Sequence, residues 1–427
     1  MTNLQVKIWI GSQNKAKTIE LEPIPDEEKW MQNLGDIKIL DMYNLGRMIF
    51  EIERYLNLDG KKKRKNVLNI TKVEIPFINQ LDNEKKKTIC EIIRGVFLLI
   101  YNLPIEFIIT SPRISLKETK MSPPLEVKNK KAVLLFSGGL DSILGLEYCK
   151  KSNLTPLLPV YISQKRRMRA VMDSIENDVI GKGNLLRISA PQISKSYFAN
   201  TAGFLYCLTG SIFSYVNKAP LIIGECGVTS YQVKFGPLNE ITYTTHPYIM
   251  DAVKNIYKVI FGIPLEIIMP FNDKTKAEMI AEYGVPLHIK ESFSCLSSNP
   301  FVKNMKIIKN CGKCYACFVR RLAIVAAIDD PTDYIKKPFV SIKKEELLPL
   351  LEFCYILLKK FELLDYPQRE KILKYNKKDL FERFAKDTFS ALYKVSKSET
   401  LPTYINQYLK EFDKSELEER LKILKVE

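Results

Sequence analysis

The chain has 427 residues, 46% of them hydrophobic, so it is long enough for two or three domains and can bury a sizeable core. Its formal charge of +16 permits contact with nucleic acid, although the basic run Lys61–Lys65 is more typical of a solvated loop. Two histidines disfavour His-based metal sites and Ser–His–Asp catalysis, and no segment looks like a membrane span or a signal peptide. We therefore expect a cytoplasmic protein with no membrane partner.

The first 125 residues mix helical and strand patterns. Helical spacing covers residues 40–56, a strand pattern covers 67–77, and residues 92–110 fit a core helix that runs into a strand. Residues 111–131 carry Pro112, Pro123 and Pro124 among charged side chains, which is typical of a linker. These patterns predict an N-terminal α+β extension over residues 1–125.

Strand and helix patterns alternate from residue 131 onward. Strand-like runs occupy residues 131–136, 156–161, 184–189, 220–224 and 264–270. Helical patterns lie between and after them, at residues 142–151, 199–216, 247–261 and 274–283. This alternation is typical of a parallel sheet covered on both faces, which binds ligands at the C-terminal ends of its strands. We therefore predict a Rossmann-like α/β domain over residues 126–330.

After residue 330 the composition becomes rich in Lys, Glu, Leu and Tyr, with helical spacing to the end. Apolar stripes such as residues 347–358 are more typical of a face buried against the core than of a partner-binding face. We expect a helical C-terminal region over residues 331–427.

A glycine-rich loop follows the first strand of the predicted central domain. It consists of Ser137, Gly138, Gly139, Leu140, Asp141 and Ser142. Two glycines let the backbone close on an anion, and backbone N–H groups at the start of the following helix face phosphates. The serines add hydroxyl donors, and the aspartate can hold Mg²⁺ against the same phosphates. The pattern predicts a phosphate-binding loop; the alternative is a turn that merely joins a strand to a helix.

Four of the nine cysteines have the spacing of a metal site. They are Cys295, Cys311, Cys314 and Cys317. Three thiolates at short intervals can surround one side of a tetrahedral ion, and the first cysteine closes it from a preceding loop. Four protein ligands leave no open position, so we predict a structural Zn²⁺. An iron–sulfur cluster is the alternative, and disulfides are disfavoured without a secretory signal.

The SGGxDS loop resembles that of the PP-loop ATP pyrophosphatases, adenine nucleotide α-hydrolase-like proteins that cleave ATP between the α and β phosphates. Further segments are similar to one branch of that family, the 7-cyano-7-deazaguanine synthases. These segments are Tyr161–Arg166, Pro270–Glu278 (PFNDKTKAE), Ser294-Cys295 and Cys311–Arg320. The resemblance covers roughly residues 131–328 and supports the Rossmann-like fold.

Those synthases convert 7-carboxy-7-deazaguanine to the 7-nitrile with ATP, Mg²⁺ and ammonia. The resemblance implies that the six loop residues and Gln164 bind ATP and that Asp141 and Lys276 are catalytic, with Lys276 stabilising charge on the α-phosphate. It gives Arg320 a weaker ATP-binding role, with support of the cysteine segment as the alternative. No residue is assigned as a covalent nucleophile.

Two segments depart from the synthase pattern. The run 198–201 lacks an arginine, and the run 224–232 lacks an aspartate, at places that line the base pocket or the dimer contact in the family. The identity of the substrate and the step at which the reaction stops therefore remain open. Cys226, in the second run, is the one cysteine outside the metal pattern with an ambiguous role.

The length of the chain is similar to that of the enlarged synthase-like proteins of antiphage defence operons, of the Qat and type IV cyclic-oligonucleotide kinds. That resemblance implies that the activated base can be captured by an amine of a partner protein encoded in the same operon. Dimers are common among the synthases, so the resemblance also allows a homodimer.

Together these observations predict an AMP-forming carbon–nitrogen ligase that activates 7-carboxy-7-deazaguanine or a close analogue. The acceptor is ammonia or an amine of a partner protein. One alternative is a tRNA-modifying PP-loop enzyme. The positive charge of the chain favours this alternative mildly, but the chain has no cysteine pair at the place where a thiolase of that kind needs one. The other is a degenerate nucleotide-binding scaffold of a defence complex.

Overall fold

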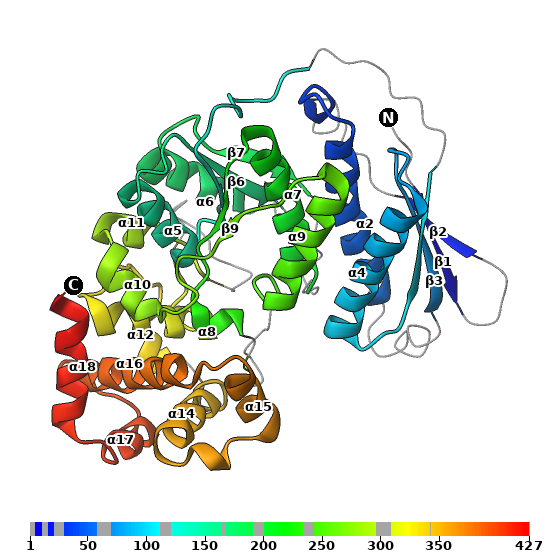
Figure 1. Cartoon of the computed structure of the whole chain (residues 1–427). Helices are drawn as coiled ribbons and strands as arrows, with labels where there is room; N and C mark the ends of the chain where they lie inside the picture. Colours follow the sequence, from blue (N-terminus) through cyan, green and yellow to red (C-terminus); the bar gives the residue numbers. More distant parts are fainter. Residues whose placement is uncertain are drawn as a thin grey trace.

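A five-stranded parallel sheet forms the centre of the molecule (Figure 1). The computed structural model describes residues 5–10, 16–20, 30–57, 70–111, 121–163, 168–190, 200–231, 233, 243–295, 309–341 and 343–426. The central strands are β5 (Ala132–Leu135), β6 (Leu157–Ser163), β7 (Leu186–Ser189), β8 (Leu221–Ile223) and β9 (Ile267–Ile268). Every neighbouring pair among them is parallel. The predicted α/β class is confirmed, and each predicted strand run overlaps one of these strands.

The order of strands across the sheet is β7-β6-β5-β8-β9. The chain first builds the sheet from β5 toward β7 and then returns to add β8 on the other side of β5. Ligands of such doubly wound sheets bind at the carboxyl ends of the strands where the order reverses. That point lies between β5 and β8, and the glycine-rich loop, residues 137–142, follows β5 directly.

Alternate side chains of the central strands enter two different apolar cores. Val133 and its neighbours on one face pack with α7 (Ala202–Asn217) and α9 (Pro247–Phe261). Leu134 and the other face pack with α5 (Leu140–Lys151) and α6 (Arg169–Ile175), which continues as the π-helical η2 (Glu176–Ile180). The period of two along each strand thus covers both faces with helices, as expected of a parallel sheet.

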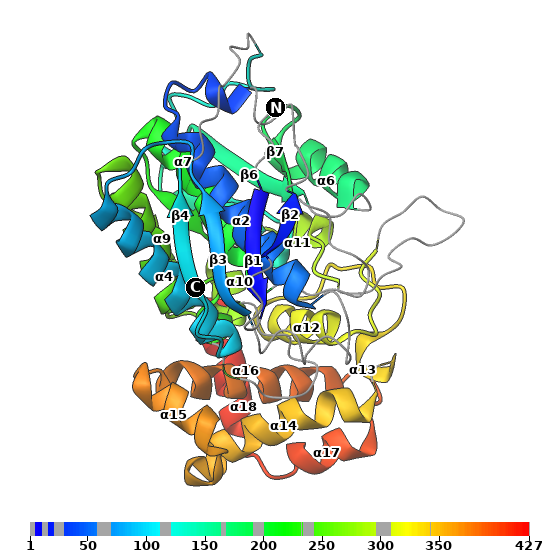
Figure 2. The same ribbon diagram turned by 90° about the vertical axis from the view of Figure 1, so that its right-hand side faces the viewer.

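A second sheet lies at the N-terminal end of the chain, in front in Figure 2. Its strand order is β2-β1-β3-β4, in which only β3 and β4 are parallel. The elements are β1 (Gln5–Ile10), β2 (Ala16–Glu20), α2 (Lys38–Asn57), β3 (Ile70–Pro76), α4 (Asn83–Tyr101) and β4 (Glu106–Thr110). The predicted helix and strand correspond to α2 and β3, whereas β1 and β2 were not predicted.

The N-terminal region shares its hydrophobic core with the central sheet. One cluster of buried side chains runs from Val6 and Ile8 through α2 to Phe204 on α7 and Val160 on β6. Every residue of α2 from Asp41 to Glu53 is buried, as expected of a helix enclosed on all sides. The domain boundary near residue 125 remains a prediction, but the packing across it is continuous.

The chain ends in a layer of helices below the central domain, coloured yellow to red in Figures 1 and 2. They are α12 (Tyr315–Ala327), α13 (Pro338–Ser341), α14 (Lys344–Lys359), α15 (Tyr366–Lys374), α16 (Lys378–Ser396), α17 (Thr403–Leu409) and α18 (Lys414–Val426), with the 3₁₀ turn η3 (Phe361–Leu363). They pack with α10 (Lys276–Tyr283), which α11 (Pro286–Glu291) follows. Leu347, Leu350 and Leu351 are buried, so the predicted stripe does face the core.

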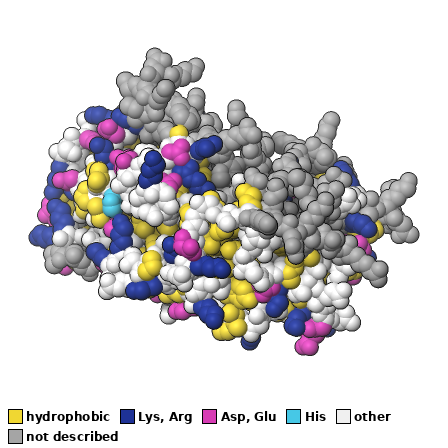
Figure 3. Space-filling view, turned by 90° about the horizontal axis from the view of Figure 1, so that it is seen from above, with side chains coloured by type: hydrophobic (Ala, Val, Ile, Leu, Met, Phe, Trp, Pro, Cys, Tyr) yellow, Lys and Arg dark blue, Asp and Glu magenta, His cyan; other side chains and the backbone are white. Residues whose placement is uncertain are grey.

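The surface gives two further observations. On the described part of the face in Figure 3, Lys and Arg side chains are scattered among acidic and uncharged ones rather than gathered in one stripe. Within the described ranges, none of the helices combines the length and apolar character that a bilayer crossing requires.

His246 links the start of α9 to the C-terminal helices. Its Nδ1 accepts a hydrogen bond from the Tyr248 backbone N–H (3.2 Å), and its Nε2 lies 3.1 Å from the Tyr375 hydroxyl. Burial lowers the pKa of His246 to about 4, and the positive charges of Lys371 and Lys374 on α15 act in the same direction. The imidazole is therefore neutral in the folded chain.

We expect the unfolding free energy to fall as the pH drops from 6.5 toward 4, because the unfolded chain takes up a proton on His246 that the folded chain rejects. This residue alone should account for about 2 kcal/mol between pH 7.5 and pH 5. Urea unfolding of the wild type and of His246→Gln at both pH values measures the difference. An equal pH dependence in the two proteins would contradict this interpretation.

Candidate functional site

The glycine-rich loop turns sharply between β5 and α5. Gly138 has a φ of +74°, which L side chains rarely adopt, and the extended Gly139 leaves the start of α5 without a capping side chain of its own. Ser142 Oγ donates to the Gly139 carbonyl (2.9 Å) and lies 3.3 Å from both Oγ and the backbone N–H of Ser137. The loop therefore presents a helix N-terminus and two hydroxyls, a geometry suited to a phosphate.

A second chain segment, around residues 293 and 294, forms hydrogen bonds with this loop. The Phe293 backbone N–H donates to the Gly138 carbonyl (2.8 Å), and the Leu140 backbone N–H donates to Ser294 Oγ (3.2 Å). Ser294 directly precedes Cys295, the first cysteine of the predicted metal site. The segment of residues 293–295 thus joins the glycine-rich loop, through hydrogen bonds, to the cysteine cluster.

Lys276 reaches the loop from α10. It is the first residue of that helix, and its Nζ lies 2.8 Å from Asp141 Oδ2, with both side chains 20% exposed. Burial alone lowers the pKa of Lys276, but the neighbouring acidic groups, chiefly Asp141 and then Cys226 and Glu225, together outweigh burial and raise the pKa above its usual value. Lys276 is therefore a permanent cation beside the loop, where the sequence-based prediction requires it.

Glu225 is the acidic residue that the sequence-based prediction missed. Its carboxylate, that of Asp141 and the Cys226 thiol all lie within 4.8 Å of one another. Among the described residues, no hydrogen-bond donor reaches Asp141 Oδ1, although that atom is buried. Burial, together with the charge of Asp141, raises the pKa of Glu225 to about 7. Two adjacent carboxylates, one with an unpartnered oxygen, could hold Mg²⁺, which prefers oxygen ligands.

Two glycines allow this close approach of β8 and α5. A Cβ on Gly224 would lie 2.6 Å from the Asp141 carbonyl oxygen and 3.0 Å from Gly145 Cα, so no side chain fits there. The strand order is a signal that could have found Glu225, because the loops after β5 and β8 meet at the switch point.

Cys226 is the ambiguous cysteine of the sequence analysis. Its side chain is 2% exposed, and burial raises the pKa of the thiol to about 11. It remains protonated at neutral pH and therefore has the character of a packed apolar residue rather than a nucleophile.

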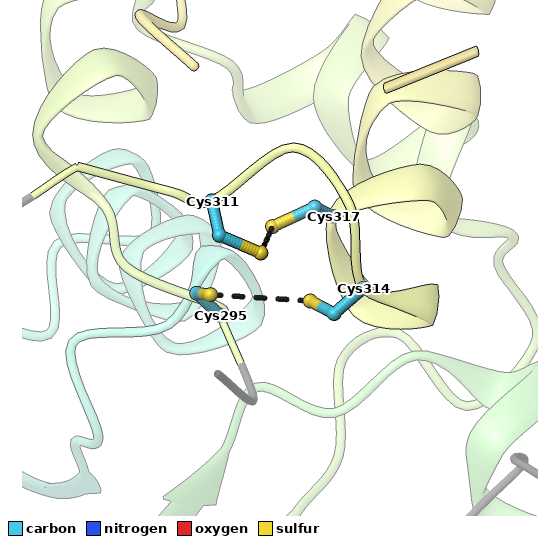
Figure 4. A group of neighbouring side chains, drawn as sticks. All are labelled: Cys295, Cys311, Cys314 and Cys317. Atoms are coloured by element: carbon cyan, nitrogen blue, oxygen red, sulfur yellow. Dashed lines mark hydrogen bonds between the residues drawn. The ribbon is translucent and has the colours of Figure 1, made fainter. Parts of the chain in front are cut away.

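The four predicted metal ligands come together in one cluster (Figure 4). Cys295 Sγ lies 3.9 Å from Cys314 Sγ, and Cys311 Sγ lies 3.9 Å from Cys317 Sγ. A tetrahedral Zn²⁺ with bonds of 2.3 Å has sulfur–sulfur edges of about 3.8 Å, so the spacing fits that ion. The cluster could therefore bind a metal such as zinc, and its four thiolates would complete the coordination.

We expect the purified chain to contain about one zinc per molecule, since four thiolates satisfy a tetrahedral ion completely. Cys314→Ser should lose most of the metal and lower the melting temperature, because structural zinc contributes directly to folding. Elemental analysis and thermal unfolding measure both effects. Cys149→Ser, at a buried cysteine outside the cluster, is the matched control and should retain its zinc. Equal zinc content in the two variants would contradict the assignment.

Arg320 is bound by the chain segment next to the loop and has no hydrogen bond to the loop itself among the described residues. It is 2% exposed, and its guanidinium donates to Ser292 Oγ (2.6 Å) and to the Ile289 carbonyl (2.6 Å). A longer contact of 3.5 Å reaches Ser294 Oγ. These partners belong to the segment that supports the loop, which matches the alternative role foreseen for this residue. Gln164 lies outside the described residues.

Comparisons with other sequences give no family for the chain. No protein-family model matches it, and a search of curated proteins finds no similar sequence. The functional interpretation therefore depends on the site itself and on the motifs in the sequence.

Proposed function

We propose that this chain is a PP-loop enzyme that activates a carboxylate with ATP, releases pyrophosphate and AMP, and joins the acyl group to an amine. The Asp141–Lys276 pair at the start of α5 carries the proposal. The pair brings a cation and a carboxylate that could hold Mg²⁺ to the N-terminus of α5, at the point of the sheet where ligands of such folds bind. Reactions at phosphorus depend mainly on such positioning and charge stabilisation.

The chemistry explains why these groups are needed. A carboxylate resists amines because its charge repels the nucleophile and because oxide is a poor leaving group. Attack of a carboxylate oxygen on the α-phosphorus forms a mixed anhydride and breaks the bond to the β-phosphate oxygen, which leaves with pyrophosphate. The amine then attacks the acyl carbon, a C–N bond forms, AMP departs with the bridging oxygen, and the amine loses a proton to solvent.

Each residue has a definite task in this scheme. The glycine-rich loop orients the phosphates, and Lys276 stabilises the negative charge that builds on the α-phosphate. Asp141 and Glu225 would hold Mg²⁺, which when bound neutralises phosphate oxygens. Arg320 acts indirectly, through the segment that carries Ser294.

We further propose that the carboxylate belongs to 7-carboxy-7-deazaguanine or a close analogue and that ammonia or a partner-protein amine is the acceptor. This part is supported by the resemblance of the loop, of Pro270–Glu278 and of the cysteine pattern to the 7-cyano-7-deazaguanine synthases. We also propose a role in antiphage defence. This role is supported by the resemblance in length and layout to the enlarged synthase-like proteins of antiphage operons.

Lys276→Met and Asp141→Asn should each lower the rate of AMP formation about 10²- to 10³-fold, because each removes charge stabilisation used in the transition state. Formation of AMP from ATP is measured by chromatography. Lys274→Met is the matched control, since Lys274 pairs with Glu282 and not with Asp141. Unchanged rates in the first two variants would remove Asp141 and Lys276 from the mechanism.

The substrate is tested by mass spectrometry of the chain with ATP, Mg²⁺ and 7-carboxy-7-deazaguanine, with and without ammonia. A free amide or nitrile together with AMP would support a small-molecule product. AMP with a base-sized mass added to a co-expressed protein would support conjugation. No AMP with any deazaguanine acid would refute the proposed substrate.

A further inference from the structure

The helix that carries Lys276 is held by two helices of the C-terminal region. Thr275, which caps α10, donates its hydroxyl hydrogen bond to Asp387 on α16. Arg420 on α18 donates from Nε to the other oxygen of Asp387 (2.6 Å) and from Nη2 to Glu278 on α10 (2.6 Å). Arg383 on α16 also pairs with Glu278. Two arginines and two carboxylates thus form a balanced network around the first turn of α10.

This network fixes the backbone on both sides of Lys276. Thr275 Oγ1 accepts from the Glu278 backbone N–H (3.3 Å), and Glu278 Oε2 accepts from the Thr275 backbone N–H (2.9 Å), which is a capping box. Asp387 and the two arginines bind the same two side chains from outside. The residue before Lys276 and the residue two positions after it are therefore both anchored to distant helices.

Burial makes these contacts unlike surface ion pairs. Thr275 is 1% exposed, Asp387 4% and Arg420 9%. Buried charge pairs stabilise a fold little compared with apolar contacts, and their better-supported use is to fix one geometry. The neighbouring interface also contains buried apolar residues such as Leu380 and Phe381. The polar contacts lie at the first turn of α10, the turn that carries Lys276.

The packing around this end of α10 is incomplete. A cavity of about 80 Å³ lies behind Lys276 and Cys226, and Tyr315, Leu350 and Phe384 of the C-terminal helices line its other walls. Ala277 of this turn is buried in the apolar core, but the interface leaves space beside it, so the hydrogen bonds of Thr275 and Glu278 add a constraint that packing does not supply.

We propose that Thr275, Asp387 and Arg420 are positioning residues for Lys276, so that the C-terminal helical region completes the candidate site. They act through the cap of α10, which holds Lys276 Nζ against Asp141. The effect on catalysis rests on the proposed function, whereas the effect on the position of Lys276 does not.

The first test needs no enzymatic activity. Lys276 in the full chain is labelled with an amine-reactive ester, and the rate is measured by peptide mass spectrometry. Thr275→Val removes the hydroxyl at nearly constant shape and should raise the labelling rate several-fold, whereas Thr275→Ser should retain the wild-type rate. Arg420→Lys, which cannot bridge both carboxylates, should behave like Thr275→Val.

Glu399→Gln is the matched control for general weakening of the interface. Glu399 pairs with Arg321 on α12 and, among the described residues, forms no hydrogen bond or ion pair with α10, so its loss should lower stability without exposing Lys276. Equal labelling of Lys276 in Thr275→Val, Arg420→Lys and Glu399→Gln would overturn the proposal. The polar network would then serve only to attach the C-terminal helices to α10.

The second test uses AMP formation. Thr275→Val should lower kcat about 10-fold and leave the KM for ATP within about twofold, and it should have no further effect in a Lys276→Met background. An unchanged kcat, or full additivity with Lys276→Met, would overturn the positioning role. If the wild type forms no AMP, the proposed function fails while the labelling experiment still decides the position of Lys276.

Discussion

The ion pair between Asp141 and Lys276 is the contact on which the rest of the site depends. It joins the first turn of α5 to the first turn of α10, two helices whose N-termini would otherwise bring like partial charges together. Removing one partner of a half-buried pair leaves the other charge poorly solvated. Loss of either Asp141 or Lys276 should therefore disturb the site as much as loss of both. In the proposed complex Lys276 would pair with a phosphate and Asp141 would hold Mg²⁺, so neither charge would be left uncompensated.

Two supports outside the central sheet hold the two halves of this pair. On the side of Asp141, Ser294 and Phe293 bind the glycine-rich loop, while Arg320 holds their segment and the adjoining cysteines are suited to a metal. On the side of Lys276, the C-terminal helices hold the cap of α10. The sheet thus sets the place of the site, and the distance between its charges depends on these supports.

The sequence carries the parts of this arrangement that leave a local pattern. Strand-like runs of five to seven residues predict the central strands, and close spacing predicts the glycine-rich loop and the cysteine cluster. Glu225 leaves no pattern, because a single acid after a strand is common and only the strand order places it beside Asp141. The inward direction of Arg320 and the contact between Thr275 and Asp387, 112 residues apart, arise from tertiary packing that periodicity does not encode.

The flanking regions are parts of the central fold rather than appendages to it. On α2, Glu53 is fully buried and accepts hydrogen bonds from the backbone N–H groups of Asn200 (2.6 Å) and Thr201 (2.7 Å), so it holds the two residues that lead into α7 from another region of the chain. The C-terminal helices enter the second core and hold α10. Withdrawing a buried carboxylate that accepts several hydrogen bonds would leave its buried N–H donors unpaired, which is costly. The inner faces of both flanks are therefore occupied by contacts with the central fold, and only their outer faces are open to a partner.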